Sequence, residues 1–277
     1  MELLRASAYD AHTFNINFER EAKRLTAQVD LFWDGDRTFF LKQIPQTPIA
    51  LLDIGCGTGR LLQHLEPVFP HAFCIGVDAD VSLCTMARKN LKIPLRKLCL
   101  ACSSVYSLSF SSKTFDVVIA RLLLEHLSDP SVALHEIFRI LKIGGKAIII
   151  DNDFDFHLRT WPPIDEFDEY YNAYCMAREQ AGGNPKIGRQ LPRFLKQAGF
   201  SEIAFEMYCA FNYKTGNDLF LQSEGQGIPD NLVRMGFLKR DSLYSLKKKW
   251  AVMLRTPGHT IVRPLFYAIG IKSTPQT

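Results

Sequence analysis

From about residue 48, short apolar runs alternate with longer amphipathic segments, and this alternation limits the fold more than any other feature. The short runs have the length of buried strands, and the longer ones repeat apolar residues at helical spacing. Strands that alternate with helices form a mostly parallel sheet with helices on both faces. The sequence therefore predicts an α/β fold with strands over residues 48–55, 72–78, 95–102, 114–123, 146–151, 201–211 and 261–271.

The ends of this pattern have a helical character. Residues 1–47 repeat apolar side chains at steps of three and four, which predicts an N-terminal helical cap before a domain of residues 48–277. Residues 152–186 and 216–256 are expected to be helical insertions in that domain. The first insertion follows the fifth strand, so it starts at the sheet edge where such folds bind ligands. We expect this insertion and the N-terminal cap to enclose a pocket there.

Composition excludes several classes of protein. Hydrophobic residues make up 47% and charged residues 22% of the 277 residues, which is typical of a folded globular chain. A net charge of +4 does not indicate a nucleic-acid partner. The sequence has no run long and apolar enough to span a bilayer and no secretory signal, so a cytoplasmic protein is expected. Cys99 and Cys102 lack a second ligand pair at zinc spacing, so we expect reduced cysteines and no metal.

A glycine-rich turn joins the first expected strand to the helix that follows. It reads Asp-x-Gly-x-Gly-x-Gly, with Asp53 before the glycines and Gly59 as the last of them. Glycines allow a tight turn and the close approach of a ligand to the backbone. Asp78, at the tip of the second expected strand, is well placed to accept hydrogen bonds from the two hydroxyls of a ribose. The pattern predicts a nucleoside site at the carboxyl ends of the strands.

Two common nucleotide motifs are absent from this turn. The dinucleotide fingerprint needs glycine at position 60, where this chain has Arg60, so NAD-dependent oxidoreduction ranks last among the functions considered. A phosphate-binding loop needs a downstream Gly-Lys-Ser/Thr, which is also missing. The acid at position 53 is a poor neighbour for pyrophosphate, but it suits a ligand with a cationic amino group.

Four motifs in order resemble one family. They are LLDIGCGTG (51–59), GVDAD (76–80), TFDVVIARLLLEHLSDP (114–130) and LKIGGKAII (141–149). Together they resemble the class I S-adenosylmethionine-dependent methyltransferases, in the broad group of ubiquinone/menaquinone-biosynthesis-type and small-molecule enzymes. The resemblance implies a Rossmann-like, doubly wound, mostly parallel seven-stranded sheet with helical cap insertions, and S-adenosylmethionine as the cofactor.

The resemblance also implies which residues contact the cofactor. Asp53 and the glycines would lie near its methionine part, Asp78 at the ribose and Ala79 at the adenine. Backbone groups at Arg121 would hold the methionine amino group. The family usually has an aspartate near the adenine where this chain has Ser104 and Val105, which bears on affinity rather than on cofactor identity. The full expected set is Asp53, Gly55, Cys56, Gly57, Gly59, Asp78, Ala79, Ser104, Val105 and Arg121.

Candidates for catalysis follow the fourth expected strand. His126 and the adjacent Glu125 are the best-placed general bases, which are needed only if the acceptor is a hydroxyl or a protonated amine. The alternative is a histidine that packs or caps locally. The candidates for the substrate pocket lie in the insertion that follows the fifth strand, and the alternative is that its aromatic residues form a core of their own. These pocket candidates are His157, Trp161, Tyr170 and Tyr171.

The leading hypothesis is methylation of a small organic molecule at oxygen, nitrogen or carbon. The rivals are a protein or RNA methyltransferase and a regulator that binds S-adenosylmethionine without transferring the methyl group. The insertion at 152–186 is acidic and therefore a poor platform for RNA, which favours a small acceptor.

Overall fold

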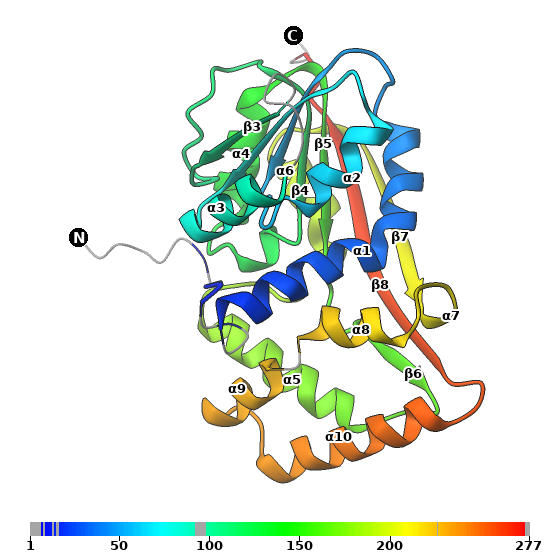
Figure 1. Ribbon diagram of the computed structural model, residues 1–277. Coiled ribbons are helices and arrows are strands. Elements are labelled where there is room, and N and C mark those ends of the chain that lie inside the picture. Colours follow the sequence, from blue (N-terminus) through cyan, green and yellow to red (C-terminus); the bar gives the residue numbers. More distant parts are fainter. Residues whose placement is uncertain are drawn as a thin grey trace.

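A computed structural model of the chain describes residues 7, 9–12, 14, 17–91, 98–225 and 227–274. Its centre is one eight-stranded sheet in the order β3-β2-β1-β4-β5-β8-β6, with β7 paired to β8 (Figure 1). The strands are β1 (Ala50–Ile54), β2 (Phe73–Asp78), β3 (Leu98–Cys102), β4 (Phe115–Arg121), β5 (Leu141–Asp151), β6 (Arg159–Trp161), β7 (Ser201–Phe211) and β8 (Thr260–Ile271). The mostly parallel α/β sheet expected from the sequence is thus confirmed, although residues 95–97 of the expected third strand lie outside the described residues.

The sheet has one strand more than the seven expected. β5 pairs with β8 only along Phe266–Ile271, which leaves the first residues of the twelve-residue β8 without β5 as a neighbour. The three residues of β6 pair there, antiparallel to Thr260, Ile261 and Val262. The extra strand therefore arises because β8 extends beyond the carboxyl end of β5 into the region of the cap.

The parallel strands bury alternate residues on opposite faces of the sheet. Leu51, Val117 and Ile148 belong to one hydrophobic cluster, together with residues of α1 (Phe18–Gln43) and α2 (Arg60–Val68). Leu52 and Val118 belong to a second cluster, with α4 (Pro130–Ile140) and α6 (Leu191–Gln197). Helix α3 (Val81–Asn90) packs on β2 and β3. The period of two in a strand therefore explains why both faces need a layer of helices.

Helix α1 is part of the same folded unit as the sheet. The side chain of Asn17 caps it by accepting a hydrogen bond from the backbone nitrogen of Arg20. Its buried Phe39 and Phe40 belong to the cluster that contains Leu51 and Tyr267 of the sheet. The helix thus lies against β-strand residues on one side and contacts α8 on the other (Figure 1).

The remaining helices gather at the carboxyl end of the parallel strands (Figure 1). We call residues 159–180 and 212–255 the cap. They comprise β6, α5 (Glu166–Gln180), α7 (Asn212–Thr215), α8 (Asn217–Glu224), α9 (Ile228–Arg234) and α10 (Arg240–Arg255). Short 3-10 turns occupy Leu124–His126 and Gly188–Gln190. Among the described helices, none is both long enough and apolar enough to cross a membrane.

Candidate functional site

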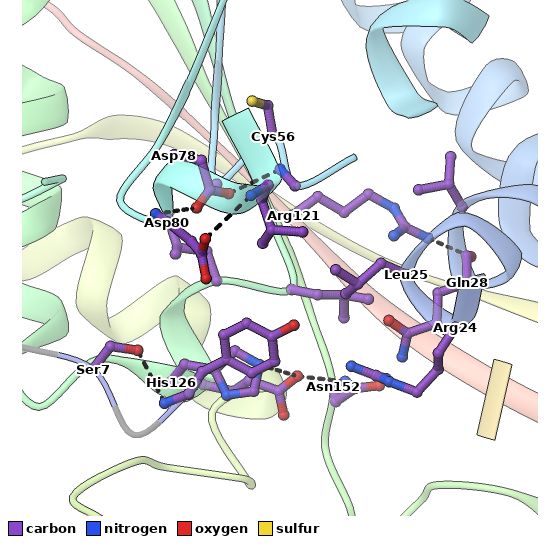
Figure 2. A pocket seen from close by; sticks show the side chains of 18 of the residues that line it. Ser7, Arg24, Leu25, Gln28, Cys56, Asp78, Asp80, Arg121, His126 and Asn152 are labelled. Atoms are coloured by element: carbon purple, nitrogen blue, oxygen red, sulfur yellow. Dashed lines mark hydrogen bonds and ion pairs between the residues drawn. The ribbon is translucent and has the colours of Figure 1, made fainter. Parts of the chain in front are cut away.

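A cavity of about 380 Å³ lies between the carboxyl ends of the parallel strands and the cap, within the usual size range of ligand sites. One part, which we call the glycine half, is lined by residues 53–58, 78–80, 103–105 and Arg121. The other part, the aromatic half, is lined by Tyr9, Glu125, His126, Asn152, Phe154, His157, Tyr170, Tyr171, Tyr174, Glu224 and Arg263. Figure 2 shows Asp78 and Asp80 at one end of the cavity and His126 and Asn152 at the other.

The glycine-rich turn is fixed by backbone hydrogen bonds to the neighbouring strand. The nitrogens of Gly55 and Cys56 both donate to the carbonyl oxygen of Val77, at 2.8 and 3.0 Å. Gly57 has a φ of +53°, which residues other than glycine rarely adopt. If a Cβ were built on Gly57, the nearest described atom, on Leu25, would be 3.8 Å away. The turn therefore leaves open space above Gly57, on the wall of the cavity.

Gly59 has a different role from the one expected. It caps the N-terminus of α2 and does not line the cavity. A Cβ on Gly59 would lie 2.9 Å from a methyl group of Leu91 and 3.2 Å from the Cβ of Ala87. Its φ of +76° and this close packing against the end of α3 account for a glycine at this position without a ligand contact.

Asp78 lies at the tip of β2 and joins the turn to the next helix. Its carboxylate accepts hydrogen bonds from the backbone nitrogens of Gly57 and Asp80, each at 2.9 Å. Burial raises its pKa, while these two hydrogen bonds act in the opposite direction. Ala79 follows it on the cavity wall, and Ser104 and Val105 face the cavity from the loop after β3, so the structure places all four together as expected.

Asp53 is a buried carboxylate at the end of β1, 2% exposed. One of its oxygens, Oδ2, has no hydrogen-bond partner among the described residues. Burial raises its pKa to about 7, with Arg121 opposing the shift and Asp78 adding to it. A cationic group in the cavity would stabilise the charged form of this carboxylate.

Arg121 connects the cavity floor to α1. Its Nε donates to Asp36 at 3.0 Å, and its Nη2 donates to the carbonyl oxygen of Gln28 at 3.1 Å. The hydroxyl of Tyr267 donates to the other oxygen of Asp36. All of these groups are buried, so α1 is fixed over β4 and β8 by an ion pair that sequence reasoning missed.

Glu125 and His126, in the turn after β4, both line the aromatic half of the cavity. Oε1 of Glu125 accepts a hydrogen bond from Nδ2 of Asn152 at 2.7 Å and lies 3.6 Å from Nε2 of His126. The ring of Tyr9 packs over His126 with ring centroids 5.0 Å apart. Burial, together with Arg178 and Arg24, lowers the pKa of His126 well below its usual value, so the imidazole is neutral near pH 7.

His157 and Tyr171 join a buried network that reaches β8. Nε2 of His157 lies 3.2 Å from Oε2 of Glu224, and the hydroxyl of Tyr171 donates to the same oxygen at 3.1 Å. Arg263 forms an ion pair with Glu224 at 2.8 Å. Burial lowers the pKa of His157 to about 4. Burial acts to raise the pKa of Glu224, but Arg263 and the two hydrogen bonds outweigh it and lower the pKa to about 2.

The aromatic residues of the insertion both fill a core and face the cavity. Phe154 stacks between His157 and Tyr174, with centroid distances of 4.2 and 4.3 Å, and Tyr170 also lines the cavity. Trp161 does not: its side chain is 67% exposed, and it lies outside the cavity lining. As the last residue of β6 it pairs with Thr260 at the edge of the sheet, which directs it away from the site.

Several cavity residues had no motif to mark them. Tyr9 and Arg24 come from the N-terminal segment and Asn152 from the insertion, the two segments expected to enclose the pocket, but the sequence did not single out these residues as cavity lining. Arg263 could have been found from the sequence, because it is a charged residue inside the apolar run 261–271. A charge that interrupts a buried strand requires a partner, and Glu224 supplies it.

Comparison with known proteins agrees with this geometry. A methyltransferase-domain family model matches residues 52–149. An uncharacterised methyltransferase of Schizosaccharomyces pombe is 30% identical over 161 residues, 56% of this chain and 57% of that protein. The demethylmenaquinone methyltransferase of Lactococcus lactis is 26% identical over 176 residues, 58% of this chain and 69% of that protein. This chain thus spans little more than half the length of the Schizosaccharomyces pombe relative.

A solved structure shares the fold. It is the phosphoethanolamine N-methyltransferase 2 of Haemonchus contortus in complex with S-adenosylmethionine, with a TM-score of 0.60 and 19% identity, covering 96% of this chain and 60% of that one. The sheet, the motif order and the matched family define the class: the chain carries a class I S-adenosylmethionine-dependent methyltransferase domain. Demethylmenaquinone methyltransferases are among the relatives that this domain matches.

Proposed function

We propose that this protein transfers a methyl group from S-adenosylmethionine to a small organic molecule. The observation that carries the proposal is the single cavity in which the glycine half continues into the aromatic half. Such a cavity provides room for a methyl donor and an acceptor side by side, which is the geometry that a direct displacement requires. Its walls come from the sheet, α1 and the cap, so the acceptor is surrounded by protein rather than bound to an open surface.

The residues of the glycine half fit the cofactor. When bound, S-adenosylmethionine supplies an electrophilic methyl group on a positively charged sulfur. Gly57 leaves the backbone open to a ligand, and the Asp78 carboxylate at the tip of β2 is placed to accept from ribose hydroxyls. The unpartnered oxygen of Asp53 is suited to a cationic amino group. Together, these three residues offer the contacts that a charged nucleoside with an amino-acid tail would need.

The aromatic half supplies the acceptor side. Glu125 and His126 stay our candidates for catalysis, because both are buried, adjacent and on the cavity wall. Neutral His126 can accept a proton, and Glu125 can orient or compensate a positive acceptor. His157, Tyr170 and Tyr171 shape the pocket. The names of the relatives support a small acceptor, since demethylmenaquinone and phosphoethanolamine are both small molecules.

Calorimetry with S-adenosylhomocysteine tests the cofactor assignment. Asp78→Ala should weaken binding by about 1–3 kcal/mol, the range for loss of charge-assisted hydrogen bonds. Asp129→Ala is the matched control, because Asp129 also accepts from two backbone nitrogens, those of Ser131 and Val132, but at the N-terminus of α4 and outside the cavity lining. Unchanged affinity in Asp78→Ala would contradict the ribose assignment.

Methyl transfer itself is tested with S-adenosylmethionine that carries a labelled methyl group. The protein is incubated with a cell extract, which is then separated by filtration into small molecules and macromolecules. Label in the small-molecule filtrate supports the proposal. Label confined to the macromolecules would point to a protein or RNA acceptor instead, and binding without any transfer would point to a regulator.

A further inference from the structure

The part of the aromatic half around Glu125 contains three buried hydrogen-bond acceptors that have no hydrogen-bond partner among the described residues. They are Oε2 of Glu125, Oδ1 of Asn152 and Nδ1 of His126. These residues, Glu125, Asn152 and His126, are 3%, 1% and 9% exposed. Because His126 is neutral, and its Nε2 faces the carboxylate of Glu125 at 3.6 Å, the proton belongs on Nε2 and Nδ1 is an acceptor. Buried acceptors without partners are costly, so they indicate a ligand that brings donors.

These three acceptors belong to one cluster. Nδ2 of Asn152 donates to Oε1 of Glu125 at 2.7 Å, which fixes the amide relative to the carboxylate. The backbone nitrogen of Glu125 donates to Asp151 at 3.2 Å, which anchors the turn after β4 to the end of β5. Figure 2 shows His126 and Asn152 on the same side of the cavity, with Arg24 next to Asn152. The cluster is therefore rigid before any ligand arrives.

We propose that the molecule that receives the methyl group is an amine, and that Glu125 and Asn152 bind its nitrogen. This inference rests on the proposed methyl transfer. The number of hydrogen-bond donors that each class of methyl acceptor carries distinguishes an amine from a hydroxyl or an acidic carbon. A hydroxyl brings one hydrogen, and an acidic carbon brings none that bonds well to oxygen. A primary ammonium group brings three, which match Oε2 of Glu125, Oδ1 of Asn152 and Nδ1 of His126.

The charges around the cluster favour the same class. Arg24 is already paired with Glu21 through two hydrogen bonds, and Arg263 is paired with Glu224. These arginines and Arg178 act to lower the pKa of Glu125, but burial outweighs them and raises it. A bound cation would stabilise the ionised Glu125 carboxylate, whereas a phenolate or carboxylate acceptor beside that carboxylate would be repelled.

The chemistry balances with these residues. The bound ammonium group gives one proton to Nδ1 of His126, which leaves a neutral nitrogen with a lone pair. Desolvation lowers the pKa of both groups, so burial alone does not set the direction of this transfer. An ammonium group ordinarily has a pKa about four units above that of imidazole, so the transfer is uphill and the neutral amine is the minor, reactive form. The lone pair then forms the nitrogen–carbon bond while the carbon–sulfur bonding pair stays on the sulfur of the donor. Positive charge moves from sulfur to nitrogen, next to Glu125, which stabilises it there.

A binding experiment tests the inference without depending on activity. The protein, saturated with S-adenosylhomocysteine, is titrated with 2-phenylethylamine and with 2-phenylethanol, which differ only in the amino and hydroxyl groups. We expect the amine to bind at least about tenfold more tightly, roughly 1.4 kcal/mol. Equal affinities, including no binding of either probe, would overturn the inference.

Two variants test whether Glu125 is responsible for the preference for the amine over the alcohol. Glu125→Gln keeps the shape of the side chain but removes its charge, so it should lose most of the preference for the amine. Glu169→Gln is the same substitution at an exposed position of α5 and should keep it. A preference that survives in Glu125→Gln would mean that another group recognises the amine, and the assignment to Glu125 would be wrong.

A labelling experiment separates this inference from the proposed function. Half of a small-molecule extract is treated with N-hydroxysuccinimidyl acetate, which blocks amines, and both halves are offered to the protein with labelled S-adenosylmethionine. Label that disappears in the blocked half supports an amine. Equal label in both halves would overturn the amine while methyl transfer to a small molecule stands, and label in neither half would contradict both proposals.

Discussion

The two halves of the cavity are built in different ways. The glycine half comes mainly from the first turns after β1, β2 and β3 and from the end of β4. Its Asp78 carboxylate is bound by nearby backbone, through the hydrogen bonds from Gly57 and Asp80. The aromatic half is assembled from side chains far apart in the sequence, from Tyr9 to Arg263. Three acceptors around Glu125, on Glu125, His126 and Asn152, have no hydrogen-bond partner in the described protein.

This difference separates what is general from what is specific in the site. A backbone turn with glycines offers the same surface to the same cofactor whatever the surrounding side chains are. Side chains from the cap can vary without disturbing that turn, so the acceptor is selected by the cap and the loops. The comparison predicts that changes in the glycine half remove cofactor binding, and that changes in the aromatic half alter acceptor choice.

The largest effect is expected for Gly57→Val. The branched side chain would enter the space above the turn and would also be strained at a φ of +53°, so binding of S-adenosylhomocysteine should be lost. Gly144→Val is the matched control: it also has a positive φ, +78°, and no described atom within 4 Å of a Cβ, but it lies outside the cavity lining. Calorimetry should show binding in the control alone, and circular dichroism should show that both variants fold. Normal binding by Gly57→Val would mean that the turn does not contact the cofactor.

The next effect concerns the buried ion pair between Asp36 and Arg121, which fixes α1 to the sheet. Asp36 is fully buried and fixes α1 to Arg121 of β4 and Tyr267 of β8, so Asp36→Ala leaves a buried arginine unpaired. Loss of one partner of a buried ion pair should lower the free energy of unfolding by about 3–5 kcal/mol. Urea denaturation measures this change.

Asp34→Ala in the same helix is the control for Asp36→Ala. Its carboxylate is 60% exposed and pairs with the exposed Lys214, so the change should cost no more than about 1 kcal/mol. Similar losses in the two variants would show that the buried ion pair does not anchor α1.

The smallest of the three effects depends on pH. The folded protein keeps a proton on Asp53 up to about pH 7, whereas an unfolded chain loses it near pH 4, so the free energy of unfolding falls as pH rises between these values. Asp53→Asn removes this penalty. It should stabilise the ligand-free protein at pH 8 by up to about 4 kcal/mol and have little effect at pH 4.

The same Asp53→Asn variant should bind S-adenosylhomocysteine more weakly, because the amide has no charge for a cationic amino group. Thermal unfolding at the two pH values measures the first effect, and calorimetry measures the second. A variant that is no more stable than the native protein at pH 8 would show that Asp53 is not penalised by burial in the folded state.

Much of the fold could be predicted from the sequence because its signals are local. The apolar runs that became β1, β2, β4 and β5 are long enough to need burial on both faces, and the turn at residues 53–59 has glycines where positive φ occurs. Among the predicted ligand contacts, Gly59 lies outside the cavity lining, because glycine spacing cannot distinguish a glycine that faces a ligand from one packed against Leu91. β6 was missed because its three residues form a strand only where β8 extends past β5.

The alternation of the parallel strands with helices, the glycine-rich turn and the acid at the tip of β2 could be read from the sequence, since each depends on residues close together in the chain. The tertiary structure decided how Asp36 reaches Arg121, how Glu224 reaches Arg263, and which acceptors near Glu125 are left without partners. These are contacts between segments that are distant in sequence, and no local periodicity encodes them. Burial gives them their importance, because a polar group removed from water must find a partner in the protein or in a ligand.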